Sequence, residues 1–534
     1  MKPFAALLDS LIFTPSRNAK LRLIADYMAH TPDPDRGYAL AALTGDLTFR
    51  TAKPALIRQL VAERVDPELF GWSYDFVGDL AETAALIWPE RPSIQGGNRD
   101  WPHLAEVVER LDSAGRTEVP GLLAEWLDAL DATGRWALLK LITGGLRVGV
   151  SARLAKTAVA TLGTIDPAEV EEVWHGLEMP YAPLFAWVEG KAPRPAVEAG
   201  AGFRPLMLAN PLEAREIEAL DAAAYRAEWK WDGIRVQIAA RGGQRRLYSR
   251  TGDDISGAFP DILEAMDFDA VLDGELLVLR DGEVAPFNDL QQRLNRKSVT
   301  PKLLRAHPAH VRLYDLLFDG DEDLRPLPFD ARRAKLEVWH ARTAPDRMDL
   351  SPLIPFAHLD ELEALRAGAR DAAIEGLILK RGDSPYLAGR PKGPWFKWKR
   401  DPLTLDVVLM YAQRGHGKRS SFYSDYTFGV WRGTEPGAEL GAELVPVGKA
   451  YSGFTDAELL ELDKWVRNHT TDRFGPVRAV EPGLVLEVAF DSAHPSPRHK
   501  SGYALRFPRI HRIRWDKPAE EADRIETVTG LAMT

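Results

Sequence analysis

The chain has 534 residues, too many for one hydrophobic core, and this length indicates about three domains. Its hydrophobic fraction of 45% and charged fraction of 27% are typical of a globular protein in water. There is no cysteine, which excludes disulfides, thiol catalysis and cysteine-ligated zinc, and favours a reducing cytoplasm.

No signal peptide and no membrane partner are predicted. The N-terminal stretch MKPFAALLDSLIFTPSRNAK is partly apolar, but Asp9 interrupts it and no small-residue cleavage site follows. No uncharged run approaches the ~18 apolar residues of a membrane-spanning helix. We therefore expect a cytoplasmic protein.

The formal net charge of −10 argues against a nucleic-acid partner, but two segments are strongly basic. Residues 380–419 hold ten Lys or Arg against three Asp, and residues 498–517 hold seven against one. Local basic clusters matter more than net charge for a surface that binds phosphates. Both segments also contain aromatic residues and strand patterns, which argues against plain solvated loops.

Residues 1–195 are predicted to form a helical domain. Long stretches rich in Ala, Leu and Glu, such as PGLLAEWLDALDATGRWALLKLIT, have apolar residues at three- and four-residue spacing. The segment GKAPRPAVEAGAGFRP that follows is rich in Pro, Gly and Ala, and is predicted to be a linker.

Residues 205–400 are predicted to form an α+β domain built on antiparallel sheets. Ile234, Val236 and Ile238 alternate with Arg235 and Gln237, the period of a half-buried strand. Further predicted strands are RRLYS, AVLDGELLVL, VRLYDLLF, EGLILK and PWFKWK.

Residues 401–534 are predicted to form a small closed β-barrel such as an OB-fold. The predicted strands are LTLDVVLMYAQ, YTFGVW, LVPVGKAYS and LVLEVAF, separated by Gly-rich turns. No internal repeat and no low-complexity tract is present.

The segment EWKWDGIR places Lys230 between two tryptophans. A lysine held among aromatic rings loses hydration, which disfavours its ammonium form, and a neutral amine is a nucleophile. The sequence has no G-x-x-x-x-G-K-[ST] loop and no G-x-G-x-x-G that opens a helix. A nucleotide attacked by this lysine would therefore need side chains as its phosphate ligands.

The middle region offers such side chains. Two carboxylates, Glu275 in LDGEL and Glu375 in EGLILK, suit a Mg²⁺ ion that keeps several waters and bridges phosphate oxygens. Lys397 and Lys399 are two residues apart, so both point to one face of a strand, where they would neutralise an α-phosphate. Tyr314 could stack on an adenine ring.

Each of these features alone has an ordinary explanation. A K-x-D-G tetrapeptide occurs by chance, Glu375 could be a strand-edge charge, Tyr314 a core residue, and the paired lysines a solvated face. It is their occurrence together and in this order that argues for a site.

This order of motifs resembles that of the nucleotidyltransferase superfamily, which comprises ATP-dependent DNA ligases, RNA ligases and mRNA capping enzymes. EWKWDGIR is similar to the nucleophile motif, and YSR, LDGEL, YDLLF, EGLILK and WFKWK are similar to the motifs that follow it. LRFPRIHRIRWDK is similar to the motif of the barrel domain, and LLKLITGGLRVGVS to the signature of the DNA-binding domain. The resemblance covers nearly the whole chain and is nearest to bacterial ATP-dependent ligases of the three-domain type.

The resemblance implies an ATP-dependent DNA ligase that seals nicks between a 5′-phosphate and a 3′-hydroxyl in repair, recombination or replication. It implies an all-α DNA-binding domain, an α+β antiparallel nucleotidyltransferase (adenylation) domain and an OB-fold domain. The expected cofactors are ATP, as AMP donor, and Mg²⁺ or Mn²⁺. The expected partner is nicked duplex DNA, encircled by a monomer in a bacterial cytoplasm or nucleoid.

For the AMP moiety, the resemblance assigns five residues. Lys230 becomes adenylylated, Glu228 reads the amino edge of adenine, and Tyr314 stacks on the base. Arg235 and Arg250 hold the ribose and phosphate region.

For the metal and the phosphates, the implied roles are as follows. Glu275 contacts the ribose and lies near the metal, which Glu375 also serves. Lys397 and Lys399 hold the α-phosphate. The leaving pyrophosphate is oriented by residues of the barrel motif, namely Arg514, Asp516 and Lys517. The DNA-binding residues are Arg147, Lys418 and Arg419.

One position departs from the family pattern. Relatives carry a basic residue one place after Arg390, where this chain has Pro391. Arg390, as a nucleotide-binding residue, or Lys392 is expected to replace that contact.

Three other protein classes share part of this pattern. An RNA ligase or capping guanylyltransferase uses the same lysine chemistry, but neither needs a helical domain that encircles a duplex. NAD-dependent ligases carry a four-cysteine zinc module, which this chain has no cysteine to build. A non-catalytic DNA-binding scaffold would have lost site residues, whereas every expected position but one is filled.

Overall fold

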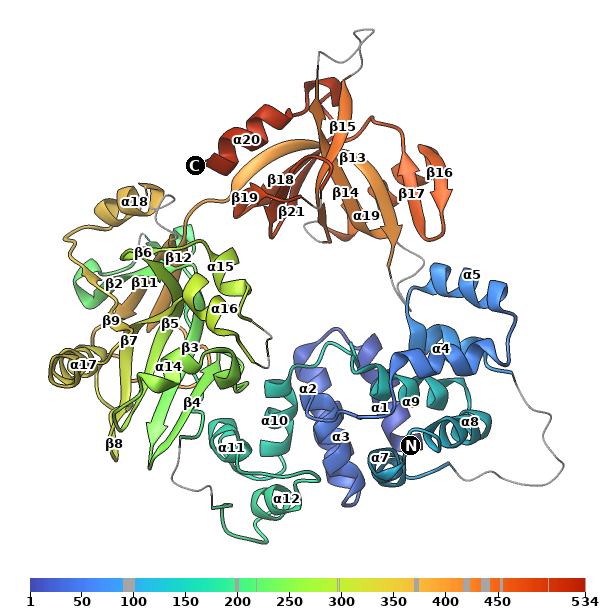
Figure 1. Cartoon of the computed structure of the whole chain (residues 1–534), viewed down its shortest axis with the longest axis horizontal. Helices are drawn as coiled ribbons and strands as arrows, with labels where there is room; N and C mark the ends of the chain where they lie inside the picture. Colours follow the sequence, from blue (N-terminus) through green and yellow to red (C-terminus); the bar gives the residue numbers. More distant parts are fainter. Residues whose placement is uncertain are drawn as a thin grey trace. The chain divides into compact units, whose positions relative to one another are not determined.

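The structure is a computed structural model of the chain. It describes residues 1–89, 101–196, 201–217, 219–294, 296, 298–368, 374–415, 423–433, 442–451, 455–497 and 499–533. Two compact units are present, and the chain passes between them more than once (Figure 1). The first comprises Met1–Leu162, Met179–Ala182 and Pro402–Thr534, and the second comprises Gly163–Glu178 and Pro183–Asp401.

The N-terminal part of the chain is helical. Its helices are α1 (Lys2–Phe13), α2 (Arg17–His30), α3 (Asp35–Thr44), α4 (Pro54–Ala62), α5 (Pro67–Val77), α6 (Leu80–Ile87), α7 (Leu104–Ser113), α8 (Val119–Ala129), α9 (Ala132–Thr143), α10 (Ala152–Ala160), α11 (Pro167–Trp174) and α12 (Ala182–Val188). Side-chain oxygens of Ser16, Asp79, Asp131 and Ser151 cap helix N-termini. Helix α9 is buried from Gly134 to Ile142 and packs against α1 and α6, so it forms the centre of this helical core.

Helix α11 belongs to the second unit and not to the helices before it. Glu172 on α11 accepts hydrogen bonds from Arg325 at 2.6 Å and from Arg194 at 2.9 Å. The ring of His175 lies 5.7 Å from that of Phe203 and 5.2 Å from that of Tyr248. The chain first leaves the first unit after Leu162, and the domain boundary at residue 195 stays a prediction.

The second unit contains two sheets. Their strands are β1 (Asn210–Pro211), β2 (Tyr225–Trp231), β3 (Ile234–Arg241), β4 (Gln244–Ser249), β5 (Ala270–Arg280), β6 (Glu283–Val284), β7 (Ala309–Asp319), β8 (Glu322–Asp323), β9 (Met348–Leu350), β10 (Leu353–Ile354), β11 (Ile374–Arg381) and β12 (Trp395–Lys399). One sheet has the order β4-β3-β5-β7-β8, with β6 and β9 added at β5 and β7, and the other has the order β1-β12-β11-β2-β10. The pairings are antiparallel except β1–β12 and β7–β9, so the predicted antiparallel α+β character is confirmed.

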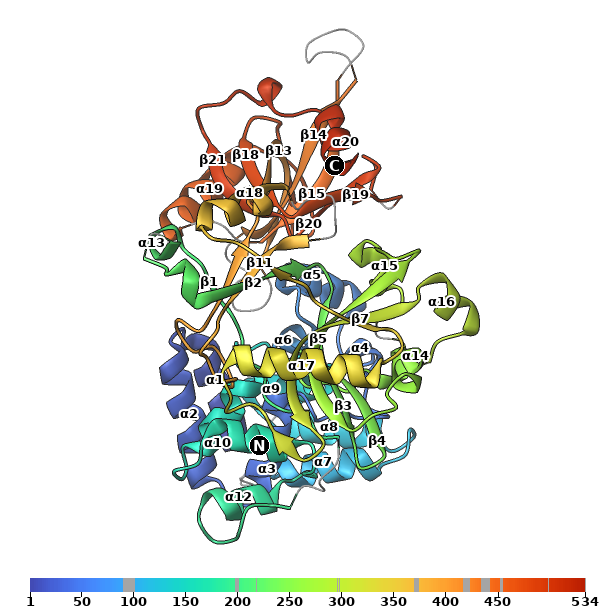
Figure 2. The same cartoon turned by 90° about the vertical axis from the view of Figure 1, so that its left-hand side faces the viewer.

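Helices cover the larger sheet. They include α14 (Pro260–Glu264), α15 (Phe287–Gln291) and α17 (Phe329–Thr343), whose residues join its apolar core. Residues of α13 (Ala214–Ile217) and α18 (Leu359–Gly368) pack on the smaller sheet, and α16 (Pro301–Ala306) precedes β7 without a buried residue. Figure 2 shows α17 lying along the sheet of β3, β5 and β7, and its buried Leu336 and Trp339 join the apolar core of that sheet. This docking brings the polar side chains of α17 next to the strands.

A two-residue connection joins the two sheets after Trp231, the residue that follows Lys230. β2 ends at Trp231 and β3 begins at Ile234, so only Asp232 and Gly233 carry the chain across. A Cβ atom on residue 233 would lie 2.5 Å from the carbonyl oxygen of Leu276, which is too close for any side chain. Glycine is therefore required here, and it holds the end of β2 against β5.

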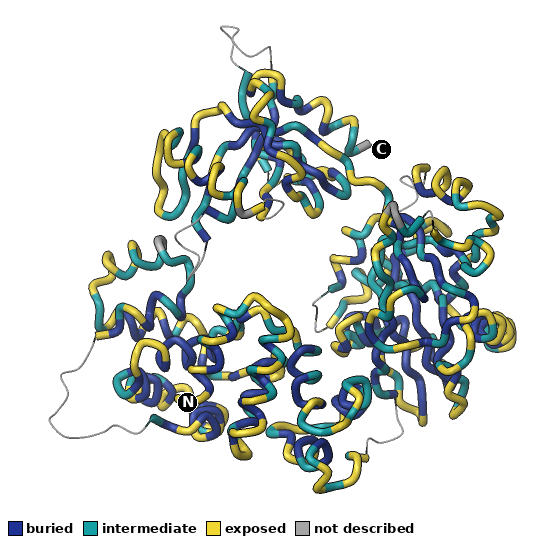
Figure 3. Tube along the Cα trace, turned by 180° about the vertical axis from the view of Figure 1, so that it is seen from behind, coloured by how far each residue is buried: buried dark blue, intermediate teal, exposed yellow. Residues whose placement is uncertain are grey.

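The C-terminal part of the chain is a strongly curved antiparallel sheet with a buried interior (Figure 3). Its strands are β13 (Leu403–Arg414), β14 (Tyr423–Arg432), β15 (Glu443–Ala450), β16 (Thr470–Phe474), β17 (Val477–Val480), β18 (Val485–Phe490) and β21 (Arg509–Arg514), with a hairpin of β19 (Ser492–Pro495) and β20 (Tyr503–Arg506). β13 pairs with β14 along one edge and with β17 and β18 along the other. Two helices, α19 (Asp456–Asn468) and α20 (Ile525–Met533), pack on its core.

The sequence-predicted strands of both regions correspond to observed ones, and the chain is a multidomain α+β protein as expected. The three-domain division stays a prediction. Within the described ranges of the chain, no helix has both the length and the apolar character needed to cross a membrane.

The contacts of α11 predict that this helix stabilises the second unit. A chain that begins at Gly163 should be more stable than one that begins at Ala201, because the shorter chain lacks Glu172 and His175. Loss of their contacts with Arg325, Phe203 and Tyr248 should cost roughly 2 kcal/mol. Thermal unfolding followed by circular dichroism would show a lower midpoint for the shorter chain, and equal midpoints would contradict the assignment of α11 to the second unit.

Candidate active site

Lys230 lies near the end of β2 and makes an ion pair with Glu375 on β11. The Nζ atom donates to Oε2 of Glu375, and Lys399 Nζ lies 3.5 Å from the same oxygen. The β2–β11–β12 register places Gly376 opposite both Lys230 and Lys399. Gly376 has φ +143°, and a Cβ there would lie 2.2 Å from the carbonyl oxygen of Trp398, so glycine lets the strands approach.

Glu375 is ionised in this arrangement. Burial acts to raise its pKa, but the ammonium groups of Lys230 and Lys399 lower the pKa of Glu375 to about 2. The carboxylate is therefore negatively charged at neutral pH, and it accepts a hydrogen bond from Lys230.

The expectation that two tryptophan rings enclose Lys230 is wrong, because Trp229 and Trp231 point to the opposite face of β2. Trp229 packs against an apolar cluster of its own sheet. Trp231 is buried, donates from its indole nitrogen to Ser351 Oγ at 3.2 Å, and lies 4.1 Å from the guanidinium of Arg312. Charged side chains, and not rings, set the environment of Lys230.

Four cations besides Lys230 lie near the Lys230–Glu375 pair. Burial lowers the pKa of Lys397, and four neighbouring cations lower it further. These neighbours are Arg390, Lys399, Lys230 and Arg250. Since Arg250, Arg390 and Lys399 are also exposed, the cluster presents an excess of positive charge that suits a multiply charged anion.

Glu275 lies on β5 opposite Arg235 of β3, close to this cluster. Burial raises the pKa of Glu275 to about 8, against the opposing charges of Lys230 and Arg235, and the carboxylates of Glu375 and Asp273 add to the rise. A second carboxyl group near Glu375 is thus held partly protonated, which a bound cation would reverse.

Arg235 is tied to a buried carboxylate. It donates from Nε to Asp273 Oδ1 at 3.0 Å and from Nη2 to Asp273 Oδ2 at 2.5 Å. The hydroxyl of Tyr386 donates to the same carboxylate at 2.7 Å. The guanidinium also lies 5.7 Å from the ring of Tyr314 and 5.8 Å from that of Trp395. Arg235 is therefore held rigidly beside Tyr314.

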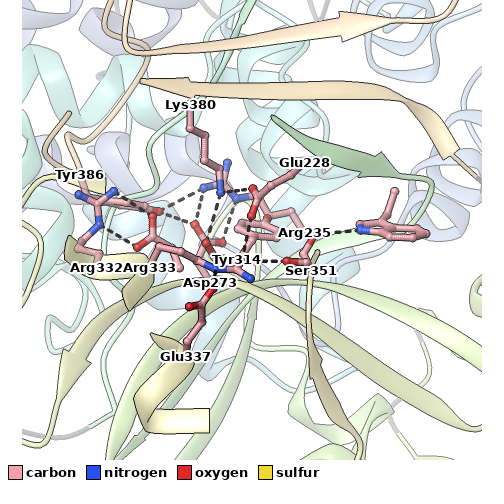
Figure 4. Close-up of polar contacts among 12 residues, drawn as sticks. Glu228, Arg235, Asp273, Tyr314, Arg332, Arg333, Glu337, Ser351, Lys380 and Tyr386 are labelled. Carbon is pink, nitrogen blue, oxygen red and sulfur yellow. Dashed lines mark hydrogen bonds and ion pairs between the residues drawn. The ribbon is translucent and has the colours of Figure 1, made fainter. Parts of the chain in front are cut away.

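Glu228 is buried in a network of charged groups (Figure 4). Lys380 Nζ lies 2.5 Å from Glu228 Oε2, and Arg333 Nη1 lies 3.3 Å from Oε1. The same Lys380 ammonium lies 4.5 Å from the centre of the Tyr314 ring. Burial raises the pKa of Glu228, and its two cationic partners oppose that rise.

The predicted barrel residues form an ion-pair network of their own. Arg514 donates from Nη1 to Asp406 Oδ2 at 3.2 Å and from Nη2 to Asp516 Oδ2 at 2.9 Å. Lys517 Nζ donates to the same oxygen of Asp406 at 2.8 Å. Asp406, on the first strand of the barrel region, thus brings Arg514 and Lys517 together.

Arg147 lies in a turn after α9 and is exposed, with φ +51°. The turn lines a cavity of about 280 Å³. Lys20 Nζ, which is buried, donates to the carbonyl oxygens of Val148 at 2.5 Å and Gly149 at 3.1 Å. The buried ammonium group of Lys20 therefore holds the turn in place. The two other predicted DNA-binding residues, Lys418 and Arg419, lie outside the described residues.

The structure thus brings the predicted residues of the middle region together and shows what the sequence analysis missed. Asp273 could have been found, since it lies two residues before Glu275 and so shares its face of β5. Lys380 ends the motif EGLILK but was given no role. Arg333 and Asp406 carry no recognisable sequence signal, because their contacts depend on how α17 and β21 pack.

Comparisons with known proteins agree with this site. A family model described as the ATP dependent DNA ligase domain matches residues 206–399, and one described as the ATP dependent DNA ligase C terminal region matches residues 419–517. A probable DNA ligase of Koribacter versatilis is 32% identical, over 98% of this chain and 95% of that protein. DNA ligase 1 of Korarchaeum cryptofilum is 33% identical, over 99% of this chain and 98% of that protein.

A solved structure titled Pmar-Lig_PreS3 has a TM-score of 0.59, with 16% identity over 96% of this chain and 99% of that one, a likeness that shows the fold alone. The two curated relatives match over nearly their whole length at more than 30% identity. The predicted family, activity and use of ATP are therefore confirmed. The chain belongs to the ATP-dependent DNA ligase family.

Proposed function

We propose that Lys230 is the nucleophile of this ligase and carries AMP between ATP and a nicked DNA duplex. The observation that supports this most directly is the position of Lys230 beside Glu375, within a cluster of cations that suits a triphosphate. The proposal gives each group of this site one part in three successive phosphoryl transfers.

In the first transfer, the Nζ atom of Lys230 attacks the α-phosphorus of ATP and pyrophosphate leaves. Lys230 must first lose a proton and exchange its contact with Glu375 for the phosphate. Lys397 and Lys399 neutralise the charge that develops on the α-phosphate, and Arg250 and Arg390 extend the same positive surface. The product is a phosphoamide bond between Lys230 and AMP.

The nucleoside is held by groups on β2, β3 and β7. Glu228 meets the 6-amino group of adenine, and Tyr314 stacks on the ring. Arg235 and Glu275 face the ribose. Burial and fixed ion partners keep Glu228 and Arg235 in place before the nucleotide arrives, which reduces the ordering that binding would otherwise require.

Glu275 and Glu375 fit a Mg²⁺ or Mn²⁺ ion. Both supply oxygen ligands. Burial raises the pKa of Glu275, and a cation bound beside its carboxyl group would favour the ionised form. The described residues contain no group of three or more acidic or histidine side chains that could hold a metal, so water and phosphate oxygens would complete the shell. The bound ion would supply charge neutralisation at the phosphates.

In the second and third transfers, AMP moves from Lys230 to the 5′-phosphate of the nick, and the 3′-hydroxyl then displaces AMP to form the phosphodiester bond. The helical region 1–195 would bind DNA through Arg147, and the OB-fold region 401–534 through Lys418 and Arg419. Residues 205–400 would form the adenylation domain. We propose that a single copy of the chain encircles the duplex.

The first test replaces the nucleophile. We expect Lys230→Arg to abolish formation of the enzyme–AMP intermediate while leaving the fold intact, because arginine keeps the charge but cannot be deprotonated in a protein. Incubation with labelled ATP and Mg²⁺, followed by acid and base treatment, measures acid-labile label on the protein. Label on the arginine variant at a rate near that of the unchanged enzyme would refute the assignment.

The second test separates the barrel residues from the α-phosphate ligands. We expect Lys517→Ala to lose about a hundredfold or more in enzyme adenylylation, yet to seal a nick that is supplied already adenylylated. Lys399→Ala should fail in both reactions, because an α-phosphate ligand serves every transfer.

Lys449→Ala is the matched control, since Lys449 is an exposed lysine of the C-terminal region that also has an ion partner, Asp425, and lies outside the two basic segments. It should behave as the unchanged enzyme does in both reactions. Single-turnover sealing of the adenylylated nick decides the matter: a Lys517→Ala enzyme as inactive there as Lys399→Ala would exclude a role confined to pyrophosphate release.

A further inference from the structure

Arg333 reaches Glu228 from a helix that carries none of the motifs. It lies on α17, is 8% exposed, and has three partners (Figure 4). Its Nη1 atom donates to Glu228 Oε1 at 3.3 Å and to the carbonyl oxygen of Ser351 at 2.8 Å, and its Nε atom donates to Glu337 Oε1 at 2.7 Å. Three acceptors therefore fix one guanidinium: Glu228 on β2, Ser351 between β9 and β10, and Glu337 on α17 itself.

The other carboxylate oxygen of Glu228 contacts Lys380. This lysine is 1% exposed, with its Nζ atom 2.5 Å from Glu228 Oε2 and 3.4 Å from the carbonyl oxygen of Tyr314. Its ammonium also lies 4.5 Å from the ring centre of Tyr314 and 4.7 Å from that of Trp395. The two carboxylate oxygens of Glu228 are thus held by different cations on different sides.

A carboxylate held in this way acts only as an acceptor. Two oxygens offer about four lone-pair directions, so one contact to each cation leaves capacity for a ligand. A protonated carboxyl group could instead donate a hydrogen bond. Burial alone favours the protonated form, and the two cations oppose it.

Whether Glu228 accepts or donates a hydrogen bond decides which base it can pair with. Adenine presents an amino group at position 6, which donates, whereas hypoxanthine presents a carbonyl oxygen there, which accepts. An acceptor with a fixed orientation pairs with the first and is left unpaired against the second. A buried polar group without a partner is costly, so such a site rejects the wrong base strongly.

We propose that Arg333 is a positioning residue that sets the selection of adenine, because it holds Glu228 as an acceptor in a fixed orientation. This inference rests on the proposed function, in which Glu228 meets the 6-amino group. Arg333 is the clearer partner to test, since Lys380 also touches Tyr314 and a change there would disturb the stacking ring.

The experiment compares ATP with inosine triphosphate as AMP or IMP donor in enzyme labelling, through the ratio of the two kcat/KM values. We expect Arg333→Met to lower this ratio about tenfold or more. Glu228→Gln should lower it as well, and the double variant should lower it no further than Glu228→Gln alone, because Arg333 acts through Glu228. Lys335→Met is the control, since Lys335 is an exposed cation on the same helix and pairs with Glu322.

The outcomes separate the two claims. An unchanged ratio in Glu228→Gln would overturn the proposed contact of Glu228 with the base, and the present inference with it. A lowered ratio in Glu228→Gln with an unchanged ratio in Arg333→Met would overturn the inference alone, as would an additional loss in the double variant. Should Arg333→Met fail to fold, Arg333→Lys replaces it, because a single ammonium cannot reproduce the forked contact. A folded Arg333→Lys enzyme with the unchanged ratio would equally overturn the inference.

Discussion

Charged groups inside a protein are costly unless each one has a partner, and this constraint organises the catalytic unit. Arg332 and Asp315 are both fully buried and bind each other through two hydrogen bonds, at 2.8 and 3.0 Å. Asp273 with Arg235, and Glu228 with Lys380 and Arg333, repeat the pattern between other elements. Because Arg332 and Arg333 come from α17, β7 and β2 are tied to the same helix. The side chains that we propose to bind the nucleotide are thus held by partners within the protein.

The balance of charge changes where the phosphates are expected to bind. Around Lys230 the cations outnumber the carboxylates, and burial together with the repulsion of neighbouring cations lowers the pKa of Lys397. The buried ion pairs such as Arg332–Asp315 and Arg235–Asp273 therefore hold their side chains in place. The cations around Lys230 instead form an excess of positive charge that a triphosphate or a DNA phosphate would relieve. In the C-terminal sheet, Asp406 pairs with both Arg514 and Lys517. Paired charges thus fix side chains, whereas the excess of cations around Lys230 suits an anionic ligand.

Much of this could be predicted from the sequence, because strands and motifs are local features. Alternation in IRVQI and the run of motifs from EWKWDGIR to WFKWK indicated the sheets, the family and most site residues. The environment of Lys230 was misjudged, although period-two alternation places both flanking tryptophans on the other face of β2. The partnership of Arg333 with Glu228, and the docking of α11 on the second unit, depend on contacts between segments far apart in the sequence. No local pattern encodes such contacts.

The central claim is that one lysine, in a site of paired charges, carries AMP. The most direct measurement is peptide mapping by mass spectrometry after incubation of the full chain with ATP and Mg²⁺, without DNA. The account predicts a single AMP adduct per chain, located on Lys230, which disappears when pyrophosphate or a nicked duplex is added. An adduct on Lys397, Lys399 or any other residue, or a stable adduct that DNA does not remove, would contradict it.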